Sequence, residues 1–499
     1  MMFDENRLRK RETLLEMGLN PYPYSFDISG QVSSIKDNLE NHDNAPVAIA
    51  GRIIAKRRHG ASIFADIEDF SGSIQIYAKK DALGDETFRV FGLLDLGDLV
   101  GVKGDLFRTK TGELTINIRQ FDILSKALVS VPLGKTTENK EYFKLSDPET
   151  KYRKRYVDWI TDRNARNRMF LRANIMSSIR RIMTEREFLE VDTPTIEMIY
   201  GGAEARPFEV NIWALDNQKA YLRISPELYL KRYIVGGFTK VFTICKNFRN
   251  EGIDRSHNPE FTMMEWYEAY TDYEYQMVQF ETLVAEVAED VLGTTTINYQ
   301  GTELDLSPPW RRLTVLESIK EYGGIDLDPM SDKEIMNYCS SNDIQLSGEY
   351  NRGLAIMEIF EALVEYNLVQ PVFIIDHPKE VSPLTKAKRG VSDLVERFEP
   401  YVFRMEIGNA YSELTDPVEQ YQRFVEQEDN RTKSDVNGDI VHHPMDTDFV
   451  EALGCGMPPT GGVGLGIDRL IMLLTDSPSI RDIIPFPMVK PGKYVNKVS

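Results

Sequence analysis

Hydrophobic and polar residues alternate in short runs over the first quarter of the chain. This alternation predicts strands with one buried face at residues 47–54, 62–68, 73–77, 99–107 and 113–124. Turn sequences such as Ser71-Gly72 and Thr111-Gly112 separate the runs. Five strands within about eighty residues favour a small β-barrel of the OB-fold type over residues 46–126. Residues 1–45 precede it as an extension with one predicted helix at 6–17.

The pattern changes after the barrel. Residues 127–156 are charged and have poor periodicity, which predicts a linker. From residue 157 to residue 499, long helical patterns mix with strands in no strict βαβ order, which favours an α+β unit built on an antiparallel sheet flanked by helices. Within that unit, residues from about 328 to 370 are mostly helical in pattern, and we interpret them as an insertion.

Two alternating runs in the large unit flank a charged loop at residues 252–257. If both runs are strands, residues two apart share a face, so Arg249 points with Glu251, and Phe261 points with Glu265. Met263 and Tyr267 would lie on the same face as Phe261. Arginine grips phosphates and carboxylates in a planar fork, and phenylalanine can stack on a base. The set suits a nucleoside triphosphate and an amine-bearing substrate, although an ordinary hairpin with a solvated charged face is the open alternative.

Glycine occupies every second position in a later segment, at Gly462, Gly464 and Gly466. Such spacing lets a strand lie very close to a ligand or to another backbone. Arg469 follows, and then an apolar run at 470–474 predicts a buried helix. The segment matches neither the dinucleotide fingerprint nor the P-loop. A strand packed tightly under a helix, without a ligand, is therefore the alternative interpretation.

Composition narrows the class of protein. The chain has 499 residues, 42% hydrophobic residues and a mean hydropathy of −0.35, which indicates a globular protein of two or three domains. No apolar run approaches the roughly 20 residues of a membrane helix. The first thirteen residues lack a signal-peptide core, and Cys245, Cys339 and Cys455 form no CxxC pair. We therefore expect a cytoplasmic protein with no membrane partner.

The formal net charge is −19, which argues against indiscriminate nucleic-acid binding and against a DNA partner. A specific RNA partner is still compatible, because local basic patches can steer it. Candidate patches lie at residues 7–11, 56–58 and 151–155. The alternative for each of them is a solvated surface cluster.

The two segments described above resemble motifs 2 and 3 of the class II aminoacyl-tRNA synthetases. Motif 2 reads F-R-x-E, a loop, and then a basic residue and a phenylalanine, and motif 3 reads GxGxGxxR. Motif 1 also fits, because a helical run with apolar residues at three- and four-residue spacing leads into a segment ending at Pro194. The apolar residues are Met169, Ala173, Met176, Ile179 and Met183. In the family this motif forms the dimer interface, so the resemblance implies a homodimer. Taken alone, without the other two motifs, the run favours a plain amphipathic core helix.

The resemblance narrows to class IIb and, within it, to lysyl-tRNA synthetases of the bacterial type, through residues 200–203, 223–231 and 406–414. Burying a lysine ammonium requires carboxylates that replace water, and Glu227, Glu265 and Glu413 stand at matching positions. The family often has Gly-Phe at Ala410-Tyr411 and Ala at Gly461, and we expect neither departure to change the substrate.

Several alternatives stay open. Within the same chemistry they are an aspartyl or asparaginyl enzyme, which the acidic pocket disfavours, and a paralogue that lysylates a protein. Such paralogues usually lack the barrel. A non-catalytic RNA-binding paralogue is the alternative from another class. The presence of both motif arginines, Arg249 and Arg469, favours an enzyme.

The resemblance implies ATP-dependent activation of L-lysine and its transfer to the 3′ end of tRNA(Lys), with Mg²⁺ as cofactor. It implies Arg249 and Arg469 as catalytic residues. The implied lysine site comprises Gly202, Glu227, Arg249, Glu265, Tyr267, Asn409 and Glu413. The implied ATP site comprises Arg249, Glu251, His257, Asn258, Phe261 and Arg469. The implied metal ligands are Glu399 and Glu406, and the implied anticodon contacts are Arg57, Phe64, Gln75 and Glu113.

Overall fold

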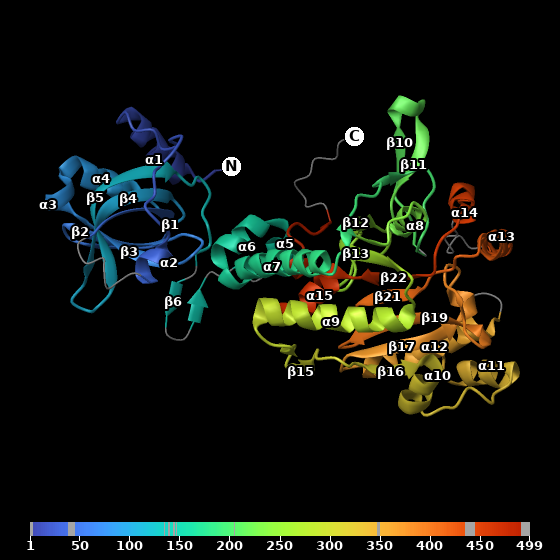
Figure 1. The fold of residues 1–499 in the computed structure, drawn as a ribbon. Helices are drawn as coiled ribbons and strands as arrows, with labels where there is room; N and C mark the ends of the chain where they lie inside the picture. Colours follow the sequence, from blue (N-terminus) through green and yellow to red (C-terminus); the bar gives the residue numbers. More distant parts are fainter. Residues whose placement is uncertain are drawn as a thin grey trace. The chain divides into compact units, whose positions relative to one another are not determined.

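The computed structural model describes residues 3–37, 45–133, 135–137, 140–142, 145, 147–203, 205–346, 350–434 and 445–490. Parts of the predicted N-terminal extension, linker and helical insertion lie outside these residues. The chain forms two compact units, Met1–Arg163 and Asn164–Ser499. Figure 1 shows the first in blue to teal and the second in green to red. None of the helices in the described ranges is long and apolar enough to cross a bilayer.

The first unit contains a closed five-stranded barrel in the order β1-β2-β3-β5-β4. Its strands are β1 (Pro46–His59), β2 (Ser62–Glu68), β3 (Ser73–Lys79), β4 (Leu99–Arg108) and β5 (Leu114–Ser125). Ile63, Ala65 and Ile67 alternate inward on β2 and are buried, as the sequence pattern predicts. The predicted barrel is thereby confirmed. Two short helices that the pattern did not predict, α3 (Lys80–Leu83) and α4 (Asp85–Leu93), connect β3 to β4.

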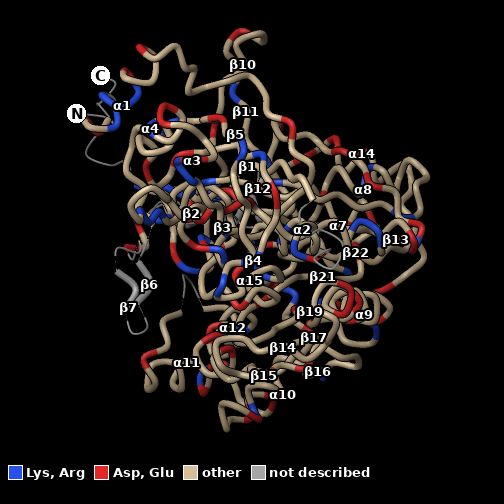
Figure 2. Tube along the Cα trace, turned by 90° about the vertical axis from the view of Figure 1, so that its left-hand side faces the viewer, with Lys and Arg blue, Asp and Glu red and all other residues tan. Residues whose placement is uncertain are grey.

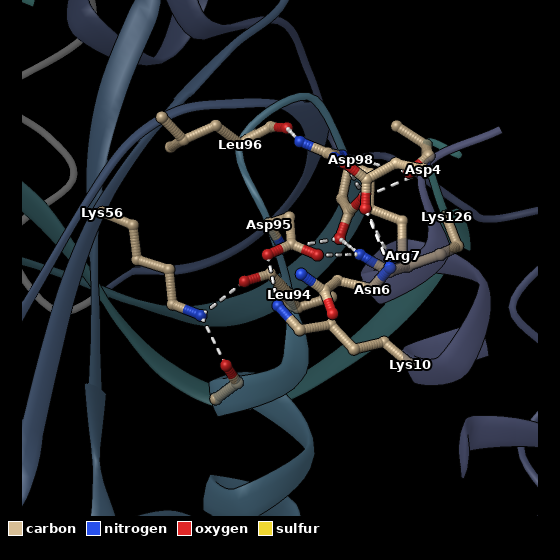
Figure 3. A network of polar contacts seen from close by, with 12 residues as sticks. Asp4, Asn6, Arg7, Lys10, Lys56, Leu94, Asp95, Leu96, Asp98 and Lys126 are labelled. Carbon is tan, nitrogen blue, oxygen red and sulfur yellow. Dashed lines mark hydrogen bonds and ion pairs between the residues drawn. The ribbon is translucent and has the colours of Figure 1, made fainter. Parts of the chain in front are cut away.

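Helix α1 (Glu5–Glu16) is anchored on this barrel by a polar network (Figure 3). Arg7 donates to the carbonyl oxygens of Ala127 and Leu96 at 3.0 and 2.9 Å. The fully buried Lys126 Nζ lies 2.6 Å from Asp95 Oδ2 and 2.8 Å from Asp98 Oδ2. Each buried charge therefore has an opposite charge or carbonyls as partners, which such burial requires. Other elements of this unit are α2 (Val32–Asp37), β6 (Lys135–Thr137), β7 (Lys140–Tyr142), α5 (Pro148–Arg153) and α6 (Arg155–Thr161).

The second unit is built on a ten-stranded, mostly antiparallel sheet, which confirms the predicted α+β class. Its main order is β16-β17-β19-β21-β22-β13-β12-β8, and β18 and β20 pair with β19. The strands are β8 (Leu189–Glu190), β12 (Lys240–Phe248), β13 (Glu260–Ala269), β16 (Arg311–Thr314), β17 (Val372–Pro378), β18 (Ala387–Lys388), β19 (Val391–Val402), β20 (Met405–Glu406), β21 (Gly408–Ser412) and β22 (Thr460–Leu465). The predicted glycine-rich strand, β22, lies between β21 and β13.

Helices cover this sheet (Figure 1). Helix α9 (Tyr273–Leu292) runs along β19, β21 and β22, and its Phe280 packs against Trp266, Phe373 and Phe398 in the main core. Helix α15 (Ile467–Leu474) follows the glycine strand and is almost wholly buried, as predicted. Also in this unit are α8 (Glu227–Val235), α10 (Val315–Ser318), α13 (Pro417–Ser434), α14 (Thr447–Gly454), α16 (Ile480–Ile483) and two small sheets. The sheets comprise β9 (Ile196–Glu197), β10 (Glu209–Ile212) and β11 (Gln218–Leu222), and β14 (Thr296–Tyr299) and β15 (Thr302–Asp305).

Two local expectations are corrected by the structure. The motif 1 run does form a helix, α7 (Arg163–Glu185), but its buried face includes Ile175 and Ile182 whereas Ala173 is exposed. The strand β12 ends at Phe248, so Arg249 and Glu251 lie in the turn beyond it and not on a strand face. A backbone hydrogen bond from Arg249 to the Pro259 carbonyl holds this turn against the start of β13.

Between β16 and β17 the chain folds into the predicted helical segment, with α11 (Asp332–Ser341) and α12 (Arg352–Leu363). These helices bury Ile335, Ile359 and Phe360 in a separate apolar cluster beside the sheet. Acidic residues are spread along the chain and not gathered on one element (Figure 2). The acidic residues of the described chain are therefore not confined to one element, and local basic groups can still guide an anionic partner.

Candidate active site

A cavity of about 440 Å³ opens over the central strands of the second unit. The antiparallel neighbours β13, β22 and β21 place side chains on one face of the sheet at its floor. The predicted residues that line it are Gly202, Glu227, Arg249, Glu251, His257, Asn258, Phe261, Glu265, Tyr267, Glu399, Glu406, Asn409 and Arg469. Residues more than two hundred positions apart thus share one site. Glu413 does not line this cavity and is fully buried beside its floor.

Three buried carboxylates gather at one end of the cavity, where Glu227 and Glu265 line the wall and Glu413 lies beside the floor. Glu265 accepts hydrogen bonds from Ser225 Oγ at 2.9 Å and from Tyr267 Oη at 3.2 Å. Glu227 accepts from Tyr411 Oη at 2.7 Å. Glu413 Oε1 has no hydrogen-bond partner in the described part of the chain. A buried acceptor without a partner is costly, so this end of the site is suited to a cationic ligand.

Burial raises the pKa of two of these carboxylates, Glu265 and Glu413. Desolvation and the neighbouring Glu227 carboxylate raise the pKa of Glu265 to about 8, although Ser225 and Tyr267 oppose the shift. Burial likewise raises the pKa of Glu413 well above its usual value. Perturbed acids gathered in one cavity are typical of functional sites. A bound ammonium would offset the cost of ionising both groups.

Gly202 closes the same end by close approach. Its backbone φ is +86°, and a Cβ there would lie 2.9 Å from both Glu227 Cβ and Ser225 Oγ. Only glycine tolerates that conformation and that space. Asn409 on β21 lies on the neighbouring wall, where its Oδ1 accepts a hydrogen bond from Arg397 Nε at 2.9 Å.

Arg249 stands in the cavity wall with its guanidinium over the Phe261 ring, 5.1 Å from the ring centre. Its Nε is buried and has no hydrogen-bond partner among the described residues. Burial lowers the pKa of Arg249, and the carboxylates of Glu251 and Glu406 act in the opposite direction. A buried guanidinium with a free donor is suited to a carboxylate or a phosphate.

Another part of the cavity collects Arg469 and His257, side chains of a kind suited to a phosphate. Arg469, in the first turn of α15, donates to the Glu406 carbonyl at 2.5 Å and lies 3.4 Å from His257 Nε2. Asp254 Oδ2 accepts a hydrogen bond from His257 Nδ1 at 2.8 Å and so fixes the imidazole ring. Desolvation would raise the pKa of Asp254, but the hydrogen bond from His257 helps to lower it to about 2. Glu251 accepts from the Arg206 backbone N–H at 3.2 Å. Asn258 Nδ2 donates to the Glu260 carbonyl at 2.6 Å.

Glu399 and Glu406 lie close together, because β20 pairs with β19 in a register that sets Glu406 opposite Tyr401. Burial opposes ionisation of Glu399, but Arg397 at 2.6 Å and His377 lower its pKa to about 2. Burial and the Glu399 charge raise the pKa of Glu406. The described residues contain no group of three or more His, Cys, Asp or Glu that could hold a metal. The two acids thus offer a partial coordination set that a ligand and water would complete.

Four functional neighbours escaped the sequence analysis. Arg397 links Asn409 to Glu399, and Ser225 holds Glu265. Tyr411 stands where the family often has phenylalanine, and its hydroxyl donates a hydrogen bond to Glu227, which a phenylalanine could not do. Lys231 lies buried between Glu227 and Glu413. Lys231 follows Glu227 by four residues on a helix, and this spacing could have predicted their ion pair from the sequence.

The barrel carries the four residues predicted for an anticodon. Phe64 lies on the outer face of β2, not in the barrel core, and packs 4.6 Å from Tyr77, which itself lies 6.0 Å from Phe107. Arg57 is opposite Phe64 in the strand register. Gln75 accepts a hydrogen bond from Thr115 Oγ1 at 3.0 Å, and Glu113 directly precedes β5. An aromatic row with polar neighbours suits stacked single-stranded bases.

Comparison with known proteins agrees with this geometry. Residues 147–490 match the family of class II tRNA synthetases (D, K and N), and residues 47–124 match the OB-fold nucleic acid binding domain. A lysine–tRNA ligase of Clostridium novyi is 47% identical over 98% of this chain and 94% of its own length. A lysine–tRNA ligase of Methanoculleus marisnigri is 46% identical over 99% of this chain and 97% of its own length. A lysine–tRNA ligase of a Thermoanaerobacter species is 45% identical over 97% of this chain and 95% of its own length.

The family match covers more than half of the chain, and these relatives align over nearly its whole length. The chain therefore belongs to the class II tRNA synthetases, in the branch that contains the lysine–tRNA ligases.

Proposed function

We propose that this chain is a lysine–tRNA ligase that activates L-lysine with ATP and transfers it to tRNA(Lys). The observation that carries the proposal is the acidic end of the cavity, where Glu227 and Glu265 line the wall and the buried Glu413 beside the floor has an Oε1 with no hydrogen-bond partner among the described residues. An aspartate side chain would meet like charge there, which disfavours an aspartyl or asparaginyl enzyme. The names of the full-length relatives support the same substrate.

In the proposed first step, the lysine carboxylate attacks the α-phosphorus of ATP, and pyrophosphate leaves. Arg249 binds the carboxylate and the α-phosphate and stabilises the charge that develops between them. Gly202 and Glu227 hold the α-ammonium. Glu265, Tyr267, Asn409 and Glu413 receive or orient the lysine side chain.

ATP is proposed to bind with its base against Phe261, and Arg469 forms the other side of the base site. Glu251 accepts from the adenine amino group. His257, Asn258 and Arg469 lie toward the triphosphate end. In the second step, the terminal ribose hydroxyl of the tRNA attacks the lysyl carbonyl and AMP leaves. This chemistry needs positioning and charge neutralisation, and no side-chain nucleophile.

We propose Mg²⁺ as the metal, held by Glu399 and Glu406. Mg²⁺ is typically bound by one or two carboxylates together with phosphates and water, and the two acids fit that donor set. When bound it would neutralise charge on the ATP phosphates. Arg397 keeps Glu399 ionised and so preserves a ligand oxygen for it.

The barrel is proposed to bind the tRNA anticodon through Arg57, Phe64, Gln75 and Glu113.

The proposed domains are an extension at 1–45, the barrel at 46–126, a linker at 127–156 and the catalytic domain at 157–499. A homodimer through motif 1 is supported by exposed apolar residues in that region, among them Leu189, Ile196 and Met198. Sedimentation at low concentration tests the homodimer.

A cytoplasmic location is proposed because tRNA and ATP are the proposed substrates, and the three free cysteines agree with it.

Amino-acid-dependent ATP–pyrophosphate exchange, measured with each of the twenty amino acids, tests the proposed substrate. Strong exchange with lysine and none with aspartate is expected. Exchange with aspartate and none with lysine would overturn the proposal.

A further inference from the structure

Helix α8 carries a buried cation that the proposed reaction does not yet use. Lys231 lies one turn after Glu227, and its side chain has no exposed surface. Its Nζ is 2.6 Å from Glu227 Oε1 and 2.5 Å from Glu413 Oε2. The rings of Tyr411 and Phe449 lie 5.7 and 5.8 Å from the same atom. Acidic and aromatic groups thus surround an ammonium that water does not reach.

The two carboxylates differ in how many of their oxygens are occupied. Glu227 uses Oε1 for Lys231 and Oε2 for the Tyr411 hydroxyl. Glu413 uses Oε2 for Lys231, but its buried Oε1 has no hydrogen-bond partner among the described residues. A Cβ on Gly462 would lie 1.8 Å from that Oε1, and Gly462 lines the main cavity. Lys231 therefore holds Glu413 so that one acceptor oxygen lies directly beside the cavity floor.

The formal charges at this end of the cavity depend on Lys231. Glu227, Glu265 and Glu413 contribute three negative charges when ionised, and Lys231 contributes one positive charge, which leaves two. Lysine brings two ammonium groups, while its carboxylate is matched by Arg249. Buried charges are tolerated when they are paired, so the bound state is balanced only for an amino acid with a cationic side chain.

From this arrangement we propose that Lys231 is a positioning and specificity residue for lysine. It acts through Glu413, whose free oxygen it directs at the substrate ε-ammonium, and it limits the uncompensated charge of the pocket to two. The inference rests on the proposed lysine activation and extends it to a residue that does not itself line the cavity.

Lys231→Met tests the proposal in lysine-dependent ATP–pyrophosphate exchange. Met keeps most of the side-chain volume but removes the charge, so Glu413 loses its fixed orientation. The KM for lysine is expected to rise by at least about tenfold, because two buried carboxylates, Glu227 and Glu413, lose their cationic partner. The KM for ATP is expected to change by less than about threefold, because the proposed ATP contacts lie in another part of the cavity. An unchanged KM for lysine in the folded variant would overturn the proposal.

Lys231→Ala with added n-propylammonium distinguishes the ammonium from mere packing. The atoms removed by this substitution correspond to that cation, which is expected to lower the raised KM for lysine. The wild-type protein is not expected to be stimulated by it. A raised KM in Lys231→Ala that propylammonium leaves unchanged would contradict the assignment of the effect to the charge.

Lys126→Met is the matched control. Lys126 is also a fully buried ammonium between two carboxylates, but it belongs to the barrel unit (Figure 3). Its loss is expected to lower the melting temperature and leave the KM for lysine unchanged. An equal rise of KM in both variants would show general destabilisation and overturn the proposal. Absence of lysine-dependent exchange in the wild-type protein would instead refute the proposed function itself.

Discussion

At the residue scale, the site combines paired charges with two buried polar groups that lack a full set of partners among the described residues. Arg249 has a buried Nε with no acceptor in the described part of the chain, and Glu413 has a buried oxygen with no donor there. The free protein bears the cost of leaving such groups unpaired, and a ligand with a carboxylate at one end and an ammonium at the other removes that cost. The carboxylate and the side-chain ammonium of such a ligand would therefore each gain a partner in the site.

Arg249→Ala is expected to reduce kcat/KM for lysine-dependent exchange by about 10²–10³-fold, equivalent to about 3–4 kcal/mol of lost transition-state stabilisation. In the proposed mechanism, the guanidinium neutralises the charge that develops at the α-phosphate. Arg311→Ala is the control, because Arg311 is exposed and pairs with Glu321 on the surface. Near-normal adenylate formation by Arg249→Ala would refute the role of this residue.

Lysine affinity is expected to rise with pH between about 6.5 and 8.5, because the pKa of Glu265 is raised to about 8 in the free protein. Below that value Glu265 is a neutral acid and pairs poorly with an ammonium, and above it the carboxylate is present. The slope is at most about tenfold per pH unit for one proton released on binding. Calorimetric titration in buffers of different ionisation enthalpy measures that proton. Glu265→Gln should reduce the release by the contribution of Glu265, and proton uptake by the wild-type protein would contradict the assignment.

At the scale of elements, the glycine strand β22 determines how close the carboxylates can lie to the sheet. A Cβ on Gly462 would lie 1.8 Å from Glu413 Oε1 and 2.6 Å from Tyr267 Cε1. Glycine on this strand therefore leaves room for the acidic end of the pocket.

Gly462→Ala is expected to displace Glu413 and Tyr267, and to destabilise the fold by about 1–3 kcal/mol through overpacking. The KM for lysine should rise together with a lower melting temperature. Gly454→Ala is the matched control, since a Cβ at the end of α14 meets nothing within 4 Å. Wild-type lysine affinity in Gly462→Ala would show that the close approach has no role in the site.

Elements with a regular pattern were predictable from the sequence, and pairings across elements were not. The barrel strands follow from period-two alternation, and α15 follows from the apolar run after Arg469. The pairing of Lys231 with Glu413 depends on how α8 packs against the end of β21, which no local pattern encodes. Arg249 and Glu251 were expected on a strand face, but β12 ends one residue before Arg249.

The site residues came from motif resemblance more than from periodicity. The resemblance named thirteen residues that line the cavity, together with Glu413 beside its floor. It gave no site role to Arg397, Tyr411 or Lys231, because their contacts are made with other side chains and do not follow from the motif itself. The side chains that hold the predicted site residues in place could therefore be identified only from the tertiary structure.

At the scale of the whole molecule, the proposed activation and tRNA recognition lie in separate compact units. Phe64→Ala in the barrel is expected to raise the KM for tRNA in aminoacylation, because loss of one stacked base costs about 1–3 kcal/mol, or about 5- to 150-fold. Exchange in the absence of tRNA should not change. A defect of Phe64→Ala in exchange would contradict this separation of roles.

The central claim is the orientation of lysine between Arg249 and Glu413, and an experimental structure with lysine and a non-hydrolysable ATP analogue tests it most directly. The lysine carboxylate should contact Arg249, and its ε-ammonium should lie within hydrogen-bonding distance of Glu413 Oε1 while Lys231 keeps Oε2. Lysine bound in the reverse orientation, or in a cavity that does not reach Glu413, would contradict the account.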